Sequence, residues 1–245
     1  MSNKTFSFKE IDIEGIDTLN VLADANKLNS WFYQTIKPFC NGKILEVGSG
    51  IGNISQFFIH NNSEVHLSDL RPNYLEFITN RFPNFNQNNF FLLDLVDPNF
   101  DEIHKDKFNS YNTIFALNVV EHILDDQQSI KNCYKLLKKG GQLIILVPAY
   151  QSLYNRFDKE LEHYRRYNQK TLNTLFSNAT FSLVHGQYFN AIGILGWFVS
   201  GRLLNNKLLP EGQVKLYNTL VPVFKVLDKL LLNKIGLSVI AIGKK

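Results

Sequence analysis

The feature that most constrains the fold is a short apolar run that leads directly into a glycine-rich turn. Residues 44–47 (ILEV) have the composition of a buried strand, and Gly48, Gly50 and Gly52 follow before a helical pattern over about 52–60. Glycine is favoured where a backbone turns with positive φ or approaches a ligand closely. A strand, a glycine turn and a helix in this order indicate a ligand-binding crossover in a parallel α/β sheet.

The rest of the chain continues this alternation of strands and helices. Further strands are predicted at 64–67, 89–93, 111–117, 142–147, 181–188 and 237–242, with helices at 72–81, 122–138 and 169–178. Apolar runs that alternate with helical patterns predict βαβ units around a parallel sheet. The expected fold class is therefore α/β, Rossmann-like and doubly wound.

One domain is predicted over 1–245, because no repeat and no low-complexity linker divides the chain. Residues 1–42 carry amphipathic helical patterns at 16–37 and are expected to form an N-terminal helical cap. A core and a substrate loop occupy 43–189, a helical insertion occupies 190–235, and the last strand lies in 236–245.

Composition excludes several classes of protein. With 44% hydrophobic and 20% charged residues the chain is not a disordered one, and a net charge of +4 without a basic-aromatic stripe gives no support for nucleic-acid binding. Cys40 and Cys133 lie far apart, and no cluster has the spacing of a metal site, so no metal is expected. No signal-like apolar segment opens the sequence, which favours a cytoplasmic protein.

The glycine turn distinguishes between two classes of cofactor. A dinucleotide fingerprint requires a third small residue at the position of Asn53, so an NAD(P)-dependent oxidoreductase is the second interpretation. The acid-x-G-x-G-x-G pattern that begins at Glu46 instead resembles motif I of the class I S-adenosylmethionine (SAM) dependent methyltransferases. SAM carries a sulfonium and an amino group but no phosphate, so an acidic residue in the turn is favourable.

Later strand ends match the same family in order. In the family, Asp69 would meet the ribose hydroxyls, Asp94 the adenine amino group, and the segment at Asn118 the methionine moiety. The resemblance implies a mostly parallel seven-stranded sheet and SAM as cofactor, with S-adenosylhomocysteine as product. It implies a cofactor site made of Glu46, Gly48, Ser49, Gly50, Gly52, Asn53, Asp69, Leu70, Asp94, Leu95, Asn118 and Val119.

Residues 158–167 (DKELEHYRRY) resemble an HxRRY-type segment found after the fifth strand in a group of bacterial methyltransferases. A glycine usually precedes that histidine, and this chain has Glu162 instead. His163 and His122 are the two candidate catalytic bases, because a neutral imidazole is the usual proton acceptor near neutral pH. Alternatively, His122 packs locally at a helix start.

Arg165 and Arg166 have two interpretations. Either they hold an anionic group of the substrate, or they pin Asp158 or Glu162 in an ion-paired loop clamp. Four aromatic residues either wall an apolar acceptor pocket or belong to the core: Trp31, Tyr33, Tyr150 and Tyr154.

The insertion at 190–235 is expected to cover the substrate pocket, to form a dimer face, or to rest on a membrane surface, in that order of preference. Its lysines would then lie near lipid headgroups: Lys207, Lys215, Lys225, Lys229 and Lys234. The protein is expected to be a monomer or a homodimer.

These features together predict a SAM-dependent methyltransferase. The segment after the fourth strand, Leu117-Asn118-Val119-Val120, is not the Pro-Pro motif of amino-directed DNA and protein methyltransferases. This difference favours a small-molecule or lipid- or glycan-linked acceptor, with oxygen as the methylated atom. The alternatives are an NAD(P)-dependent oxidoreductase and a SAM-binding protein without turnover.

Overall fold

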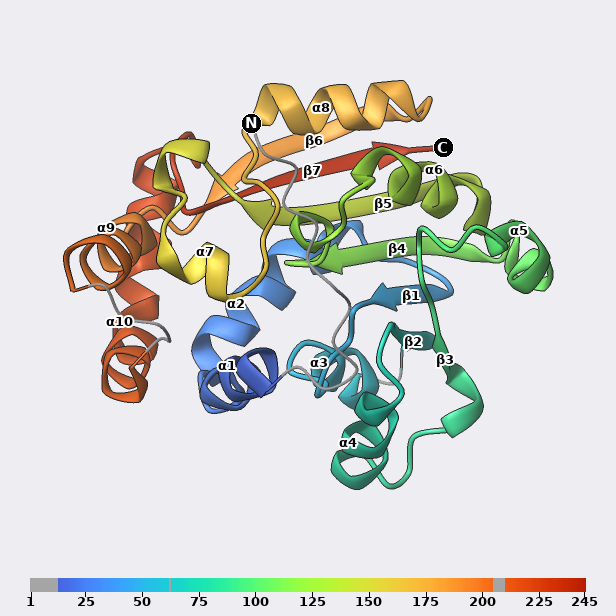
Figure 1. Ribbon diagram of the computed structural model, residues 1–245, viewed down its shortest axis with the longest axis horizontal. Coiled ribbons are helices and arrows are strands. Elements are labelled where there is room, and N and C mark those ends of the chain that lie inside the picture. The colour runs from blue at the N-terminus through green and yellow to red at the C-terminus, as the bar shows by residue number, and fades with distance from the viewer. Residues whose placement is uncertain (1–12, 62, 205–209) are drawn as a thin grey trace.

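Seven strands form one sheet in the computed structural model, which describes residues 13–61, 63–204 and 210–245 (Figure 1). They are β1 (Ile44–Val47), β2 (Val65–Asp69), β3 (Phe90–Leu92), β4 (Tyr111–Leu117), β5 (Leu137–Pro148), β6 (Ser182–Phe189) and β7 (Ser238–Lys244). The order is β3-β2-β1-β4-β5-β7-β6, with β7 antiparallel to both β5 and β6 and the other neighbouring pairs parallel. The predicted doubly wound, mostly parallel seven-stranded α/β fold is confirmed.

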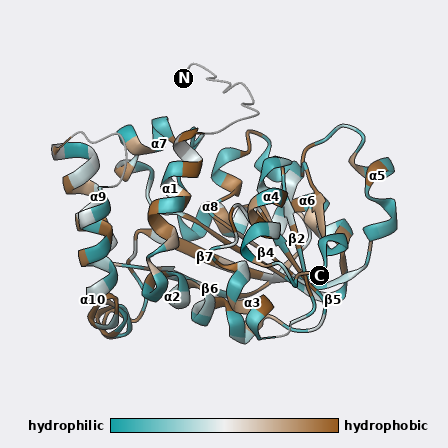
Figure 2. Ribbon diagram, turned by 90° about the horizontal axis from the view of Figure 1, so that it is seen from below, coloured by the Kyte–Doolittle hydropathy of each residue, from teal (hydrophilic) through white to brown (hydrophobic). Residues whose placement is uncertain are grey.

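Helices cover both faces of the sheet because successive strand residues point to opposite sides. One face packs against α5 (Phe100–Ile103), α6 (Asp126–Leu136) and α8 (Gln169–Asn178). The other packs against α2 (Asn26–Ile36), α3 (Ser55–His60), α4 (Asn73–Arg81) and α10 (Glu211–Leu230). Every residue of β1 is buried, and Figure 2 shows the apolar strands between the more polar helices.

Two predicted boundaries are wrong. The helix expected over 122–138 begins only at Asp126, because Asp125 caps it by accepting a hydrogen bond from the backbone N–H of Gln128 at 2.9 Å. Before it, Val120–His122 form a separate 3₁₀ turn. Strand β5 begins at Leu137, five residues before the predicted 142.

The N-terminal helices lie directly over the glycine turn. The helix α1 (Ile13–Ala23) places Leu19 so that a Cβ on Gly50 would lie 2.9 Å from its side chain. The side-chain amide of Asn53 donates to the carbonyl of Leu19 at 2.9 Å. Residues 1–12 of the predicted cap lie outside the described residues.

The insertion forms α9 (Gly193–Phe198), a π-helical turn (Val199–Leu203) and α10. Asn218 of α10 accepts hydrogen bonds from the backbone N–H groups of Lys27 and Leu28, at 2.9 and 3.1 Å, and so caps the start of α2. The Asp228 carboxylate accepts from the backbone N–H groups of Asn190 and Ala191, at 2.6 and 2.8 Å. Asn218 thus ties α10 to α2, and Asp228 ties the two ends of the insertion to each other. Lys207 lies outside the described residues.

The insertion also exposes many apolar side chains. They are Leu195, Phe198, Val199, Leu204, Leu216, Leu220, Val223, Val226, Leu230, Leu231, Leu232 and Ile235. None of the helices in the described ranges is both long enough and apolar enough to cross a bilayer.

Candidate active site

The glycine turn, which follows β1 in the chain, packs against the segment that follows β4. The backbone N–H groups of Gly48 and Ser49 both donate to the carbonyl of Ser68, each at 2.9 Å. Gly48 has φ +72°, and a Cβ there would lie 2.4 Å from Cγ2 of Val119. Only glycine fits this position, since a side chain would be strained and would collide with Val119. The turn and the residues after β4 are therefore in direct contact.

The carboxylate of Asp69 ties the end of β2 to the same turn. Its Oδ2 accepts from the backbone N–H of Gly50 at 2.9 Å, and its Oδ1 from that of Arg71 at 3.2 Å. Burial raises the pKa of Asp69, and these backbone hydrogen bonds oppose the shift. The residue that sequence reasoning assigned to the ribose is thus fixed beside the glycines.

Glu46 is a buried acid beneath the turn. Its Oε2 accepts a hydrogen bond of 2.6 Å from the hydroxyl of Ser55, at the start of α3. Burial raises the pKa of Glu46 to about 8, against the lowering effect of that hydrogen bond. A cation bound near this carboxylate would favour its ionised form.

The other predicted cofactor residues fall into two groups. Asn118 is exposed in the left-handed region at φ +55°, directly after β4, and Leu70 is exposed directly after β2. Asp94 follows β3, and its Oδ1 accepts from the backbone N–H of Val96 at 2.8 Å. These residues lie with the glycines at the carboxyl ends of neighbouring parallel strands, where ligands bind in such sheets.

In the second group, Asn53 and Leu95 are bound or packed within the protein itself. Both ends of the Asn53 amide are used, since Oδ1 accepts from Arg81 at 2.8 Å while Nδ2 donates to α1. Leu95 belongs to the core, and its carbonyl accepts from Asn132 at 2.9 Å. Ser49 is buried in the turn, and its hydroxyl has no hydrogen-bond partner among the described residues.

A second cluster is built around Asp158 in the segment between β5 and α8. Its Oδ1 lies 2.9 Å from Nδ1 of His163 and accepts from Nε of Arg166 at 2.7 Å. Its Oδ2 accepts from the backbone N–H of Asn155 at 2.9 Å, as part of the capping box of α7 (Arg156–Glu160). Although burial alone would raise the pKa of Asp158, His163 and Arg166 hold it below its usual value.

Both arginines of this segment bind acidic side chains and backbone carbonyls of the protein. Arg166, whose side chain is 1% exposed, also donates to the carbonyl of Ala149 at 3.1 Å and lies 4.6 Å from the ring centroid of Trp197. Arg165 pairs with Asp126 at 2.6 Å and donates to the carbonyl of Leu124 at 2.7 Å. The predicted ion pair is therefore present between Arg166 and Asp158, whereas Arg165 pairs with Asp126 and not with Asp158 or Glu162.

The two candidate histidines meet at the carboxyl end of β4. The rings of His122 and His163 pack edge to face, with centroids 4.6 Å apart. His163 is buried, which lowers its pKa, while Asp158 opposes the shift. His122 is exposed on one side, and partial desolvation by its neighbours, together with His163 and Arg71, holds its pKa well below the usual value.

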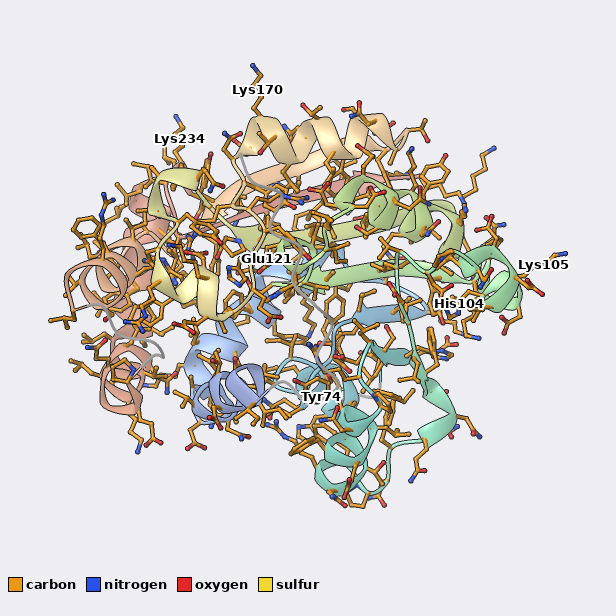
Figure 3. The ribbon with its side chains drawn as sticks, viewed as in Figure 1. Tyr74, His104, Lys105, Glu121, Lys170 and Lys234 are labelled. Atoms are coloured by element: carbon orange, nitrogen blue, oxygen red, sulfur yellow. The ribbon has the colours of Figure 1, made fainter. Side chains whose placement is uncertain are left out.

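Sequence reasoning missed the residue next to this pair, Glu121. Its carboxylate is fully buried, neither oxygen accepts a hydrogen bond from another described residue, and burial raises its pKa to about 8. Figure 3 shows Glu121 near the centre of the molecule, where β4 ends. Glu121 could have been chosen from the sequence because it is an acid that precedes a histidine shortly after a buried strand.

The four predicted substrate aromatics lie in two places. Trp31 packs on Phe189 with centroids 4.3 Å apart, and Tyr33 stacks on Phe57 at 5.1 Å, so both rings belong to the core. On the substrate-side segment, the Tyr154 hydroxyl donates to the carbonyl of His163 at 2.7 Å. Tyr150 stacks on Tyr188 with centroids 5.1 Å apart.

Comparisons with known proteins agree with this arrangement. Residues 45–143 match a family described as a methyltransferase domain. A probable polyketide synthase 42 of Dictyostelium discoideum is 30% identical over 149 residues, which are 53% of this chain and 6% of that protein. The chain thus spans only a small part of the curated relatives that it matches.

Two solved structures share the fold. A phosphoethanolamine N-methyltransferase 2 of Haemonchus contortus, in complex with phosphomonomethylethanolamine and S-adenosylhomocysteine, has a TM-score of 0.62 and 16% identity over 98% of this chain and 61% of its own. A SAM-dependent methyltransferase of Archaeoglobus fulgidus has a TM-score of 0.58 and 16% identity over 89% and 94%. Residues 45–143 therefore match a methyltransferase domain, and the chain shares its fold with these two solved methyltransferases.

Proposed function

We propose that this protein transfers a methyl group from SAM to an oxygen atom of a small or lipid-like acceptor. The observation that carries the proposal is the contact between Gly48 and Val119, three residues before His122. It brings the glycine turn, where SAM would bind, against the segment that leads to the histidine pair. A cofactor side and a proton-accepting side therefore share one edge of the sheet.

The cofactor side offers an acid for each polar part of SAM. Asp69 would accept hydrogen bonds from the ribose hydroxyls, and Asp94 from the adenine amino group. The buried Glu46 favours the positive charges of the methionine end. The exposed backbone at Asn118 would run beneath that moiety, and S-adenosylhomocysteine would leave as the product.

On the acceptor side, His163 is the proposed base. Asp158 binds its Nδ1, so the proton is held there and Nε2 remains available as an acceptor. Methyl transfer is an in-line displacement in which the acceptor oxygen forms a bond to the methyl carbon as the carbon–sulfur bond breaks. The hydroxyl proton would pass to Nε2 of His163, with His122 as the alternative base.

The apolar face of the insertion favours a lipid-like acceptor and contact with a membrane surface. Leu216, Leu220, Val223 and Leu230 recur at helical spacing and form one exposed stripe on α10, opposite the buried Val221. The insertion also exposes the basic residues Arg202, Lys215, Lys229 and Lys234. An exposed apolar stripe on a basic segment fits an anionic lipid surface, and we propose this contact for a protein on the cytoplasmic side.

Vesicle sedimentation tests the membrane contact. We expect the full chain to sediment with vesicles of anionic phospholipid and less with purely zwitterionic ones, and the double variant V223E/L230E to remain in solution. Ile103, on the far helix α5, is 52% exposed, close to the 55% of Val223, so Ile103→Glu is the matched control. Equal sedimentation of the original protein, the double variant and the control contradicts the membrane contact. A dimer of the original protein that dissociates in the double variant also contradicts it.

Calorimetric titration tests the cofactor assignment. We expect micromolar binding of S-adenosylhomocysteine and no binding of NADH to the purified chain. Binding of NADH alone would instead support the oxidoreductase. If S-adenosylhomocysteine binds, incubation with labelled SAM and a panel of hydroxylated lipids and small molecules follows, and failure to methylate any of them would favour a binding protein without turnover.

A further inference from the structure

The end of β4 contains a group of side chains that the cofactor site does not use. Ligand atoms of Glu121, His122 and His163 all lie within 4.8 Å of one another. The three residues come from two segments, the 3₁₀ turn after β4 and the segment that carries α7. We propose that they bind a divalent metal ion of the zinc type.

The buried Glu121 is the observation that points to an ion. A carboxylate without a hydrogen-bond partner is costly inside a protein unless a cation compensates it or it takes up a proton. Arg166 acts on Glu121 only at longer range, since its Nε is bonded to Asp158. A metal ion between Glu121 and the two imidazoles would bind one carboxylate oxygen and compensate the charge of the group.

One ring nitrogen of His163 is oriented by a second group, because Asp158 Oδ1 lies 2.9 Å from its Nδ1. The backbone of Leu161 near His122 opposes the lowering of the His122 pKa. Metal-binding histidines almost always donate their other N–H to a carboxylate or a backbone carbonyl in this way. The arrangement leaves one nitrogen lone pair on each ring for a ligand.

The site must contract to hold a metal ion. Metal–ligand bonds of about 2.0–2.2 Å at tetrahedral angles place two ligand atoms about 3.3–3.6 Å apart. The ligand atoms, which lie within 4.8 Å of one another, would therefore have to approach through side-chain rotations. Two histidines and one glutamate form the donor set of catalytic zinc sites that keep a position open for water or substrate.

The chemistry of such an ion would differ from that of a histidine base. A zinc-type ion acts as a Lewis acid and lowers the pKa of a hydroxyl bound at its open position, so the hydroxyl releases its proton to solvent. With the ion bound, His163 is a ligand and its Nε2 accepts no proton. The metal site does not depend on methyl transfer, and its test needs neither SAM nor an acceptor.

Metal titration of the full chain tests the proposal. Protein treated with a chelator and then dialysed is titrated with Zn²⁺ by calorimetry, and with Co²⁺ while its visible absorption is recorded. We expect one ion per chain, and a Co²⁺ spectrum typical of nitrogen and oxygen ligands. Absence of saturable binding to the folded protein would overturn the proposal.

Substitutions show whether the metal ion binds at this site or at another histidine. Glu121→Gln and His163→Ala should weaken Zn²⁺ binding by 100-fold or more, and Asp158→Asn by about 10- to 100-fold through the orientation of His163. His60→Ala, which removes an exposed histidine on α3, is the control and should bind like the original protein. If Glu121→Gln, which preserves the shape of the side chain, binds Zn²⁺ as tightly as the control, Glu121 is not a ligand and the proposal fails.

Discussion

The glycine turn and the segment around Asp158 lie at the same edge of the sheet but are held in different ways. In the turn, backbone groups make the contacts, as where the N–H of Gly50 donates to Asp69. Around Asp158, side chains make them, and Asp158 is bound to both His163 and Arg166. Few residues can replace the glycines of the turn without disturbing its backbone contacts. The cluster around Asp158 instead depends on each charged side chain keeping its partner.

The largest effect is expected from the removal of Arg166. Because Asp158 and Arg166 are fully buried, Arg166→Ala leaves an uncompensated charge, and we expect a loss of about 3–5 kcal/mol in the free energy of unfolding. Urea denaturation measures it. The control is Arg156→Ala, which breaks the half-exposed pair with Glu160 and should cost at most about 1 kcal/mol. Equal losses would show that the buried pair stabilises the fold no more than the half-exposed one.

A slightly smaller effect is expected when the turn is changed. Gly48→Ala combines a positive φ with a collision against Val119, so we expect a loss of about 2–4 kcal/mol in the free energy of unfolding. Gly212→Ala is the matched control, because no atom lies within 4 Å of its added Cβ and it sits in the first turn of α10. Thermal denaturation should show this control to be as stable as the original or more stable.

Asp69 separates cofactor binding from folding. Asp69→Ala should weaken binding of S-adenosylhomocysteine by about 1–3 kcal/mol, the scale of a lost charge-assisted hydrogen bond. Calorimetry measures the dissociation constant. Asp97 accepts a backbone N–H at 2.7 Å in a similar local turn, away from the glycines, so Asp97→Ala should leave the affinity unchanged. An Asp69 variant with full affinity would remove this residue from the cofactor site.

The smallest effect is expected from a single hydroxyl on the substrate side. Tyr154→Phe removes the hydrogen bond to the carbonyl of His163, and we expect a loss of about 1 kcal/mol in the free energy of unfolding. Binding of S-adenosylhomocysteine should not change, since the glycine turn is untouched. A loss of cofactor affinity in this variant would mean that the two regions are coupled.

The sequence predicted one of these regions far better than the other. The glycines and Asp69 each follow a strand that its own apolar pattern reveals, so their meeting at one edge follows from the parallel sheet. Nothing local indicates that Glu121 and His163 meet, because their approach depends on how the segment after β5 folds back. That fold depends on the buried pair of Asp158 and Arg166, which sequence reasoning could offer only as one alternative.

The helix α2 shows the same limit for the prediction of side-chain packing. Helical spacing predicted α2 and its apolar face correctly, but the spacing does not distinguish an aromatic that lines a pocket from one that fills the core. Trp31 and Tyr33 meet Phe189 and Phe57, whose positions are set by β6 and α3. Such contacts between distant segments become visible only in the folded chain.

The position of β7 has a consequence for the order in which the sheet can be completed. This strand lies between β5 and β6 but is synthesised after both, and the whole insertion emerges from the ribosome before it. Until then β6 has no hydrogen-bonded neighbour within the sheet, and the edge of β5 remains open. An unpaired apolar edge invites pairing with other chains, so the nascent protein passes through a period of exposure that ends only when β7 inserts between its two neighbours.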